Sequence, residues 1–138
     1  MWIFGWEENI ILQEYSKNPV NNFEIDKYTV KHHEWNFICW DDITVFLLIE
    51  EWNITNYSYT GNLSTVSIAV AGFLSEFIME SKIKDILSRD YNFINEKWIV
   101  VSNKRKRASI LPILAIRNAI HKYMDDWIVD DFDDIIND

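Results

Sequence analysis

The sequence is poor in the residues that make tight turns and covalent cross-links. Its 138 residues include three glycines, two prolines and a single cysteine, Cys39. So few turn residues disfavour an all-β sandwich or barrel, which needs a turn signal every 8–12 residues. One cysteine excludes an internal disulfide and a zinc site made of several cysteines from one chain. Its apolar neighbours indicate a small buried side chain rather than a nucleophile.

Motifs of the common enzyme classes are absent as well. The glycines Gly5, Gly61 and Gly72 are too far apart for a phosphate-binding loop, and no serine has the setting of a nucleophile elbow. The first residues carry no basic segment of a signal peptide, and no apolar run is long enough to span a bilayer. We therefore expect a cytoplasmic protein without enzymatic activity, cofactor, resident metal or membrane contact.

What the sequence does contain is ample material for a core. Hydrophobic residues make up 49% of the chain and aromatic residues 15%. Disordered chains lack such side chains, and 138 residues is the size of one ordinary domain. No repeat or Gly/Ser/Pro-rich linker divides the chain, so we predict one domain over residues 1–138. Its acidic tail, residues 130–138, either docks through Phe132, Ile135 and Ile136 or stays mobile.

The first half of the chain mixes helical and strand patterns. We predict a short helix at residues 7–15 and strands at 23–30 and 35–40. Residues 43–52 fit either a helix capped by Asp41 and Asp42 or a strand that follows a tight turn, and the helix is slightly favoured. Residues 56–62 are polar and are predicted to form a loop.

The second half is helical in pattern. Apolar residues recur at spacings of three and four from Leu63 to Ile78, with Asn62 or Ser64 as the cap, and the pattern resumes at residues 83–87. A short strand is predicted at 98–101. A last helix is expected to begin at the cap Ser109, with Pro112 in its first turn. Together these elements predict an α+β fold, with two or three long helices packed on a small antiparallel sheet.

Charge is distributed unevenly along the chain. The net charge is −9, but residues 1–60 carry −7, residues 61–107 carry +3 and residues 108–138 carry −5. The positive segment ends in Lys104-Arg105-Lys106-Arg107. We expect this run to form a solvated loop whose charges interact with the acidic segments. Because the remaining surface repels phosphate, a basic protein is a more natural partner than nucleic acid.

Two clusters have the residue types of metal sites. In His32-His33-Glu34, a strand would place His32 and Glu34 on one face and His33 on the other, with His121 or an aspartate as a further ligand. The aspartate-rich tail lacks the spacing of a calcium loop, so only weak cation binding is expected. A site of neither kind is predicted.

The most distinctive pattern is an acidic pair beside a tryptophan, which occurs at Trp6, Trp40, Trp52 and Trp127. A flat aromatic side chain gives contact area, and neighbouring carboxylates accept Lys or Arg from a partner. With the acidic tail, this pattern gives the predicted partner-binding residues: Asp41, Asp42, Glu50, Glu51, Trp52, Asp125, Asp126, Asp130, Asp131, Asp133 and Asp134.

A small, acidic, aromatic-rich chain without catalytic motifs resembles the bacterial toxin-immunity proteins of polymorphic toxin and contact-dependent growth-inhibition systems. The resemblance implies a binding module that neutralises a cognate basic toxin, often a nuclease, in a 1:1 complex by covering its active or substrate-binding surface. One alternative is a nucleic-acid mimic that inhibits a host defence complex. Another is a carboxylate- or metal-dependent hydrolase that uses Asp41/Asp42 and Glu50/Glu51.

Overall fold

The computed structural model describes residues 2–96, 101 and 103–136, with side chains described from residue 10 onward. The elements in chain order are α1 (Trp2–Lys17), β1 (Val30–Asn36), β2 (Asp41–Glu50), β3 (Asn53–Thr60), α2 (Thr65–Ile78), β4 (Ser81–Lys82), α3 (Ile83–Ile86), α4 (Tyr91–Glu96), the 3₁₀ turn η1 (Asn103–Arg105), α5 (Lys106–Met124) and α6 (Phe132–Ile135).

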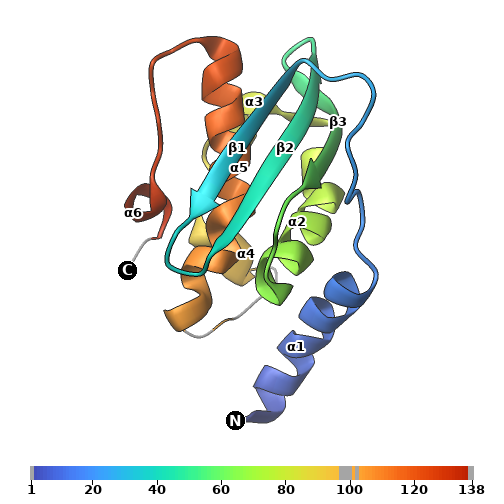
Figure 1. Cartoon of the computed structure of the whole chain (residues 1–138), viewed down its shortest axis with the longest axis vertical. Coiled ribbons are helices and arrows are strands. Elements are labelled where there is room, and N and C mark those ends of the chain that lie inside the picture. Colours follow the sequence, from blue (N-terminus) through green and yellow to red (C-terminus); the bar gives the residue numbers. More distant parts are fainter. Residues whose placement is uncertain (1, 97–100, 102, 137–138) are drawn as a thin grey trace.

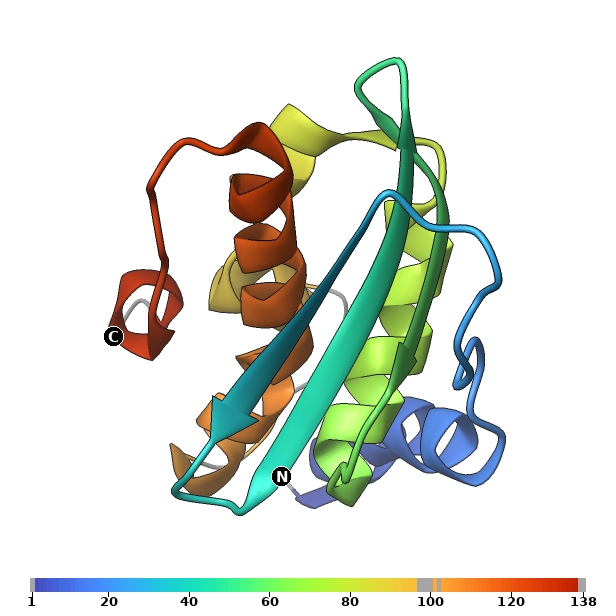
Figure 2. The same ribbon diagram turned by 45° about the horizontal axis from the view of Figure 1, so that its top comes forward.

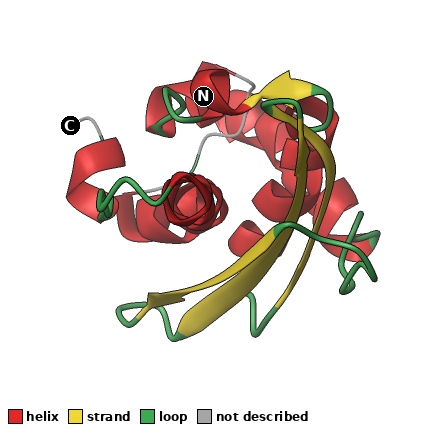
Figure 3. Cartoon of the chain, turned by 90° about the horizontal axis from the view of Figure 1, so that it is seen from above, coloured by secondary structure: helices red, strands yellow, loops and turns green. Residues whose placement is uncertain are grey.

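The strands form one antiparallel sheet in the order β1-β2-β3-β4, and the long helices α2 and α5 lie together against one of its faces (Figure 1). Seen from above, the sheet curves around α5 (Figure 3). Helix α1 packs on α2 at the side of the domain. The α+β class predicted from the sequence is therefore confirmed.

Strand β2 is the centre of the sheet and supplies the apolar floor of the core. Its alternate residues Ile43, Val45, Leu47 and Ile49 are buried toward the helices, which is the period of two expected of a strand. The slightly favoured helix at residues 43–52 was wrong, and the strand alternative holds. Branched side chains at Ile43, Thr44 and Val45 fit the pleated sheet better than a helix.

The turn between β2 and β3 explains why β3 was missed. Glu51 and Trp52 both have positive φ, 51° and 67°, and they join the paired residues Glu50 and Asn53. This is the left-handed two-residue hairpin turn that Gly and Asn usually form. Glu and Trp do not indicate a turn in a sequence, so no hairpin was expected here. The loop predicted at residues 56–62 was wrong, because most of that segment belongs to β3.

The outer face of the sheet is partly covered by the loop that connects α1 to β1. The Asn21 carbonyl accepts from Tyr59 N–H at 3.0 Å, and the Ile25 N–H donates to Ser58 Oγ at 3.2 Å. The strand predicted at 23–30 therefore lies in this loop, and β1 starts only at Val30. The strand predicted at 35–40 is mostly the turn after β1, and the strand predicted at 98–101 falls almost wholly outside the described residues.

The helices follow the predicted periodicity but not all the predicted caps. Of the two caps that the sequence left open, Asn62 and Ser64, the structure uses Ser64, which accepts the Ser67 N–H. Helix α5 begins at Lys106 rather than at Ser109, so the basic run is a 3₁₀ turn and a first helical turn, not a loop. Pro112 consequently lies inside the helix.

The described part of the acidic tail, residues 130–136, docks on the domain. After α5 the chain turns back toward the opposite end of that helix, where α6 lies (Figure 1). Ile135 of α6 is fully buried, and Phe132 and Ile136 pack against the core. In the described part of the chain, every helix is too short or too polar to cross a bilayer.

Two neighbouring core tyrosines give a test of this packing. The Tyr57 hydroxyl donates to the Ala71 carbonyl at 2.7 Å, whereas the buried Tyr59 hydroxyl has no partner among the described residues. Burial raises the pKa of Tyr59 to about 12, and burial together with Tyr59 raises that of Tyr57 well above 10. We expect Tyr57→Phe to destabilise the fold by about 1–2 kcal/mol and Tyr59→Phe to be neutral or stabilising. Urea unfolding measures both, and equal losses would contradict the assigned hydrogen bond.

Candidate functional site

The turn between β1 and β2 lies at the end of the domain where α2 and α5 begin (Figure 2). Cys39 is one of the residues of this turn. We call residues 37–40 the hairpin tip. Its side chains Phe37, Ile38 and Trp40 are 71%, 67% and 80% exposed, while Cys39 is half-buried against the core. Three large apolar groups around the single thiol form a surface suited to contact with another protein.

Just behind the hairpin tip, the buried Asp41 carboxylate is held by a serine. Ser67 Oγ of α2 donates to Asp41 Oδ2 and lies 3.0 Å from the Ala108 carbonyl of α5. Pro112 explains why that carbonyl needs a donor: in a regular helix it would accept the N–H of residue 112, which proline lacks. One hydroxyl therefore links β2, α2 and α5 directly beneath the hairpin tip.

Polar groups next to this link have no partners within the described residues. Asn36 is the cross-strand partner of Asp41, and both side chains are buried. Neither amide atom of Asn36, nor Asp41 Oδ1, has a hydrogen-bond partner. Buried polar groups are normally satisfied, so these three atoms make the base of the hairpin a candidate functional region.

A cavity of about 730 Å³ opens beside Cys39. Ile38 and Cys39 line one side, and Lys104 of η1 lines another together with Lys106 and Arg107 of α5. Asp133 and Ile136, within and just after α6, complete the lining. The cationic groups create a local positive field in an otherwise acidic protein.

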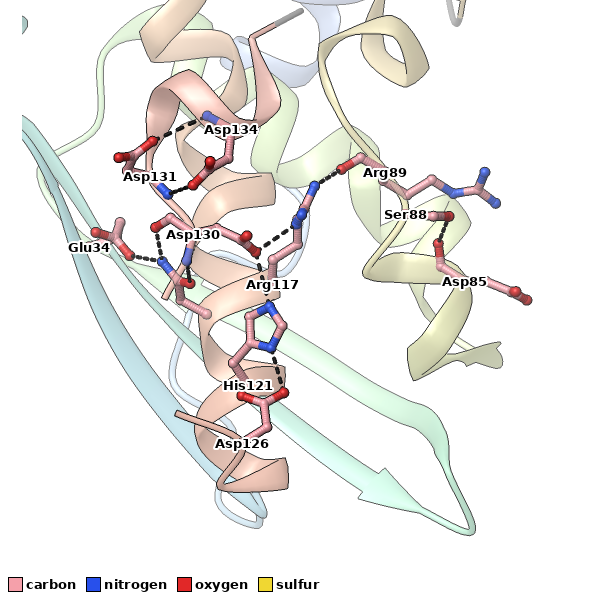
Figure 4. Close-up of polar contacts among 11 residues, drawn as sticks. Glu34, Asp85, Ser88, Arg89, Arg117, His121, Asp126, Asp130, Asp131 and Asp134 are labelled. Atoms are coloured by element: carbon pink, nitrogen blue, oxygen red, sulfur yellow. Dashed lines mark hydrogen bonds and ion pairs between the residues drawn. The ribbon is translucent and has the colours of Figure 1, made fainter. Parts of the chain in front are cut away.

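A second polar cluster lies along α5 and is drawn in Figure 4. His121 Nδ1 is 2.8 Å from Asp126 Oδ2, and its Nε2 is 3.0 Å from Asp130 Oδ2. Arg117 Nε donates to the same Asp130 oxygen at 2.9 Å. The hydrogen bond from His121, followed by that from the Ile128 N–H, lowers the pKa of Asp126 below its usual 3.8. The cluster bonds the segment after α5 to the helix. We call Arg117, His121, Asp126 and Asp130 the latch.

His32 and His33 of β1 point to opposite faces of the sheet, as predicted on the condition that they lie in a strand. His32 Nε2 contacts Glu34 Oε1 at 2.9 Å, and Glu34 also accepts from Asn118 at 2.9 Å, whereas His33 points to the other face and pairs with Asp42. No group of three or more metal-binding side chains occurs within the part of the chain that the structure describes.

The structure separates the predicted partner-binding residues into two groups. Asp41 and Asp42 lie beside the hairpin tip, where Asp41 is buried and unavailable to a partner. At the opposite end of the domain, Trp52 packs edge-on against Tyr123 of α5 and lines a cavity of about 440 Å³ with Glu51 and Met124. That end also holds the exposed Glu50 and the C-cap Asp125.

The remaining predicted residues have structural partners. Asp126 and Asp130 belong to the latch, while Asp131 and Asp134 form the capping box of α6. Asp133 is exposed and lies 3.9 Å from Arg107. Trp127 is 92% exposed and Trp40 and Trp52 are exposed too, while the Trp6 side chain is not described.

Sequence reasoning missed the polar residues that hold these clusters together. Ser67, Arg117 and Asn118 lie on helix faces whose apolar spacing alone was considered. Pro112 was the available signal, because a proline inside a helix predicts an unpaired carbonyl four residues earlier and a donor beside it.

With the geometry in place, comparison with known proteins identifies the family. Residues 7–128 match the family model of the NifU-like N terminal domain, and the chain belongs to that family. No curated protein is significantly similar to it in sequence.

Solved structures share the fold. One is a candidate iron–sulfur cluster assembly scaffold protein for the SUF system of Fervidobacterium islandicum AW-1, with TM-score 0.71, 17% identity and coverage of 80% of this chain and 93% of that one. Another is the N-terminal part of a nitrogen-fixing NifU-like protein of Brucella abortus, with TM-score 0.67, 11% identity and coverage of 86% and 94%. A third, with no function in its name, has TM-score 0.70, 18% identity and coverage of 82% and 96%.

The family overturns the toxin-immunity interpretation and its cognate toxin partner. The nucleic-acid mimic and the hydrolase lose their support with it. The resemblance depended on size, charge and missing motifs, which many small acidic binding proteins share. These features describe a surface and do not identify a fold.

The donor set of this chain does not fit an iron–sulfur cluster held by one chain alone. Such clusters are usually held by four cysteine thiolates, with histidine replacing some of them in certain types. This sequence has only Cys39, and the adjacent Asp41 carboxylate is buried and bonded to Ser67. A cluster at the hairpin tip would need most of its ligands from another protein.

The link beneath the hairpin tip gives a thermodynamic prediction. We expect Ser67→Ala to cost about 1–3 kcal/mol of unfolding free energy, because the one hydroxyl proton that is donated to Asp41 and shared with the Ala108 carbonyl is then lost. In a Pro112→Ala background the helix supplies an N–H to Ala108, so the Ser67→Ala loss becomes smaller by about 0.5 kcal/mol or more. Ser75→Ala, on the same helix, is the control. Strictly additive losses would contradict the link.

The latch gives a pH prediction. A depressed carboxylate pKa adds stability above pH 3.8, and this stability fades as the pH falls through the lowered value. In His121→Leu we expect the pKa of Asp126 to return toward 3.8, as followed by carboxyl NMR shifts. Lys122→Leu removes a charge from the same end of α5 and is expected to leave the lowered pKa in place. Equal effects of both variants would assign the shift to the general field instead.

Proposed function

We propose that this chain is a non-catalytic protein of iron–sulfur cluster assembly that binds another assembly component through its hairpin tip. Cys39 is then the one thiolate that it offers to the cluster or sulfur being handled. The observation that carries the proposal is the half-buried Cys39 among the exposed Phe37, Ile38 and Trp40, in a chain of the NifU-like family. The absence of catalytic motifs in the sequence agrees with a binding role.

The single thiol favours a binding partner over a complete scaffold. A chain that supplies one thiolate cannot saturate a cluster, so further ligands come from the bound component. Components that carry sulfur on cysteine, such as a cysteine desulfurase, have this chemistry. The exposed tryptophan and isoleucine supply the contact area with which such interfaces are usually anchored.

The test compares binding with cluster formation. The full chain is mixed anaerobically with ferrous iron, cysteine and a cysteine desulfurase from the same genome, while ultracentrifugation follows the complex and visible absorption follows the cluster. We expect the chain alone to form no stable stoichiometric cluster and the two proteins to form a complex. Trp40→Ala should weaken that complex about tenfold or more, because a central aromatic contact is lost.

Trp127→Ala is the matched control, since this tryptophan is also highly exposed but lies just beyond the far end of α5. It should bind the desulfurase like the parent chain. A stable cluster on the chain alone would contradict the proposal. Failure to bind the desulfurase, or equal losses from both tryptophan variants, would refute docking through the hairpin tip.

A further inference from the structure

The segment that follows α5 reaches back to the cavity beside Cys39. We call residues 128–136 the strap. It leaves the end of α5, runs back alongside the helix and ends in α6 near the start of the same helix (Figures 1 and 2). The family match ends at residue 128, so most of the strap lies beyond the part of the chain that defines the family.

The middle of the strap is fixed to α5 by backbone and side-chain bonds. The Asp130 N–H donates to Asn118 Oδ1 at 2.8 Å, and Asn118 Nδ2 donates to the Asp130 carbonyl at 3.0 Å. The Asp130 carboxylate accepts from Arg117 and contacts His121. Arg117 also donates to the Arg89 carbonyl at 2.7 Å, which holds its guanidinium in place. Asp130 is therefore the central residue of the latch.

The end of the strap is docked by α6. Ile135 is fully buried in the core, and the Arg107 guanidinium lies 4.8 Å from the centre of the Phe132 ring. Asp133 lies 3.9 Å from Arg107, beside the cavity that Cys39 and Ile136 also line. Helix α6 thus forms one wall of that cavity.

The strap also brings negative charge to a basic rim. Residues 129–136 carry four aspartates and no basic residue, whereas Lys104, Lys106 and Arg107 line the cavity. A docked strap therefore narrows the space beside Cys39 and offsets the positive field there. A released strap would expose both the thiol and the cationic groups.

We propose that the strap is an intramolecular gate for the Cys39 cavity. Docked, it restricts access to the thiol; released, it presents Cys39 together with a basic surface that suits an acidic segment of a partner. This inference rests on the proposed function, because it describes the regulation of the same site. The latch at Asp130 and the buried Ile135 set the balance between the two states.

The lone cysteine makes the gate measurable in the full chain. We compare the parent with the double variant Asp130→Ala/Ile135→Ala, using the anionic reagent 5,5′-dithiobis(2-nitrobenzoate) and the uncharged reagent iodoacetamide at low salt. The variant should react faster with both, and with the anionic reagent by about tenfold or more, because the basic rim loses its neutralising aspartates. High salt should reduce the extra gain of the anionic reagent.

Three controls keep the result interpretable. Glu76→Gln removes an exposed acid of α2 and is expected to react like the parent. Amide hydrogen exchange should show loss of protection in residues 129–136 and retained protection in α2 and α5. If the double variant loses its fold, the single variant Asp130→Asn, which keeps Ile135 packed, takes its place. We expect Cys39 of this variant to react faster than that of the parent, by a smaller factor than expected for the double variant.

Two results would overturn the gate. The first is a thiol reaction within about twofold of the parent rate for both reagents while the strap amides have lost protection. The second is undiminished protection of the strap in the variants, which would show that the latch does not hold it. Since only small reagents are used, neither result depends on a partner, and a failure to bind the desulfurase would leave the gate standing.

Discussion

The structure depends most on one hydroxyl. Ser67 bonds to the Asp41 carboxylate and reaches the Ala108 carbonyl that Pro112 leaves unpaired. A buried carboxylate and a broken helical hydrogen bond would each be costly in an apolar core, and here a single side chain from α2 serves both. Because the three groups come from β2, α2 and α5, the two long helices are held in register with the central strand directly beneath the hairpin tip.

This link also places the candidate site. With the base of the hairpin fixed, Phe37, Ile38 and Trp40 project into solvent while Cys39 turns toward the basic start of α5. The fold is that of the NifU-like N terminal domain family, but the chain brings one thiol to it. In the function proposed above, this thiol is one ligand of a site shared with another protein.

The opposite end of the domain has a different character. Trp52 and Tyr123 pack edge-on, and Glu51 and Met124 line the neighbouring cavity. From there the strap carries its carboxylates back to the only strongly basic stretch of the sequence. The net charge of −9 therefore does not indicate the local charge at either end of the molecule. Folding places positive and negative segments next to each other.

The sequence by itself determined the α+β class and the helical face of residues 63–78, because these follow from local periodicity, while it left the helix cap open between Asn62 and Ser64. Opposite faces for His32 and His33 followed only on the condition of a strand, and no strand was predicted at residues 31–34. Strand β3 was not predictable in this way, since its turn uses Glu51 and Trp52 at positive φ in place of Gly or Asn. For the site, the sequence singled out the acidic pairs and assigned Cys39 to the core, and it could not show that Asp41 is buried and Trp40 exposed. Only the tertiary structure decided that Asp41, Ser67 and Ala108 meet and that the strap reaches Cys39. These contacts join residues far apart in the chain, and their energy depends on burial that no local pattern encodes.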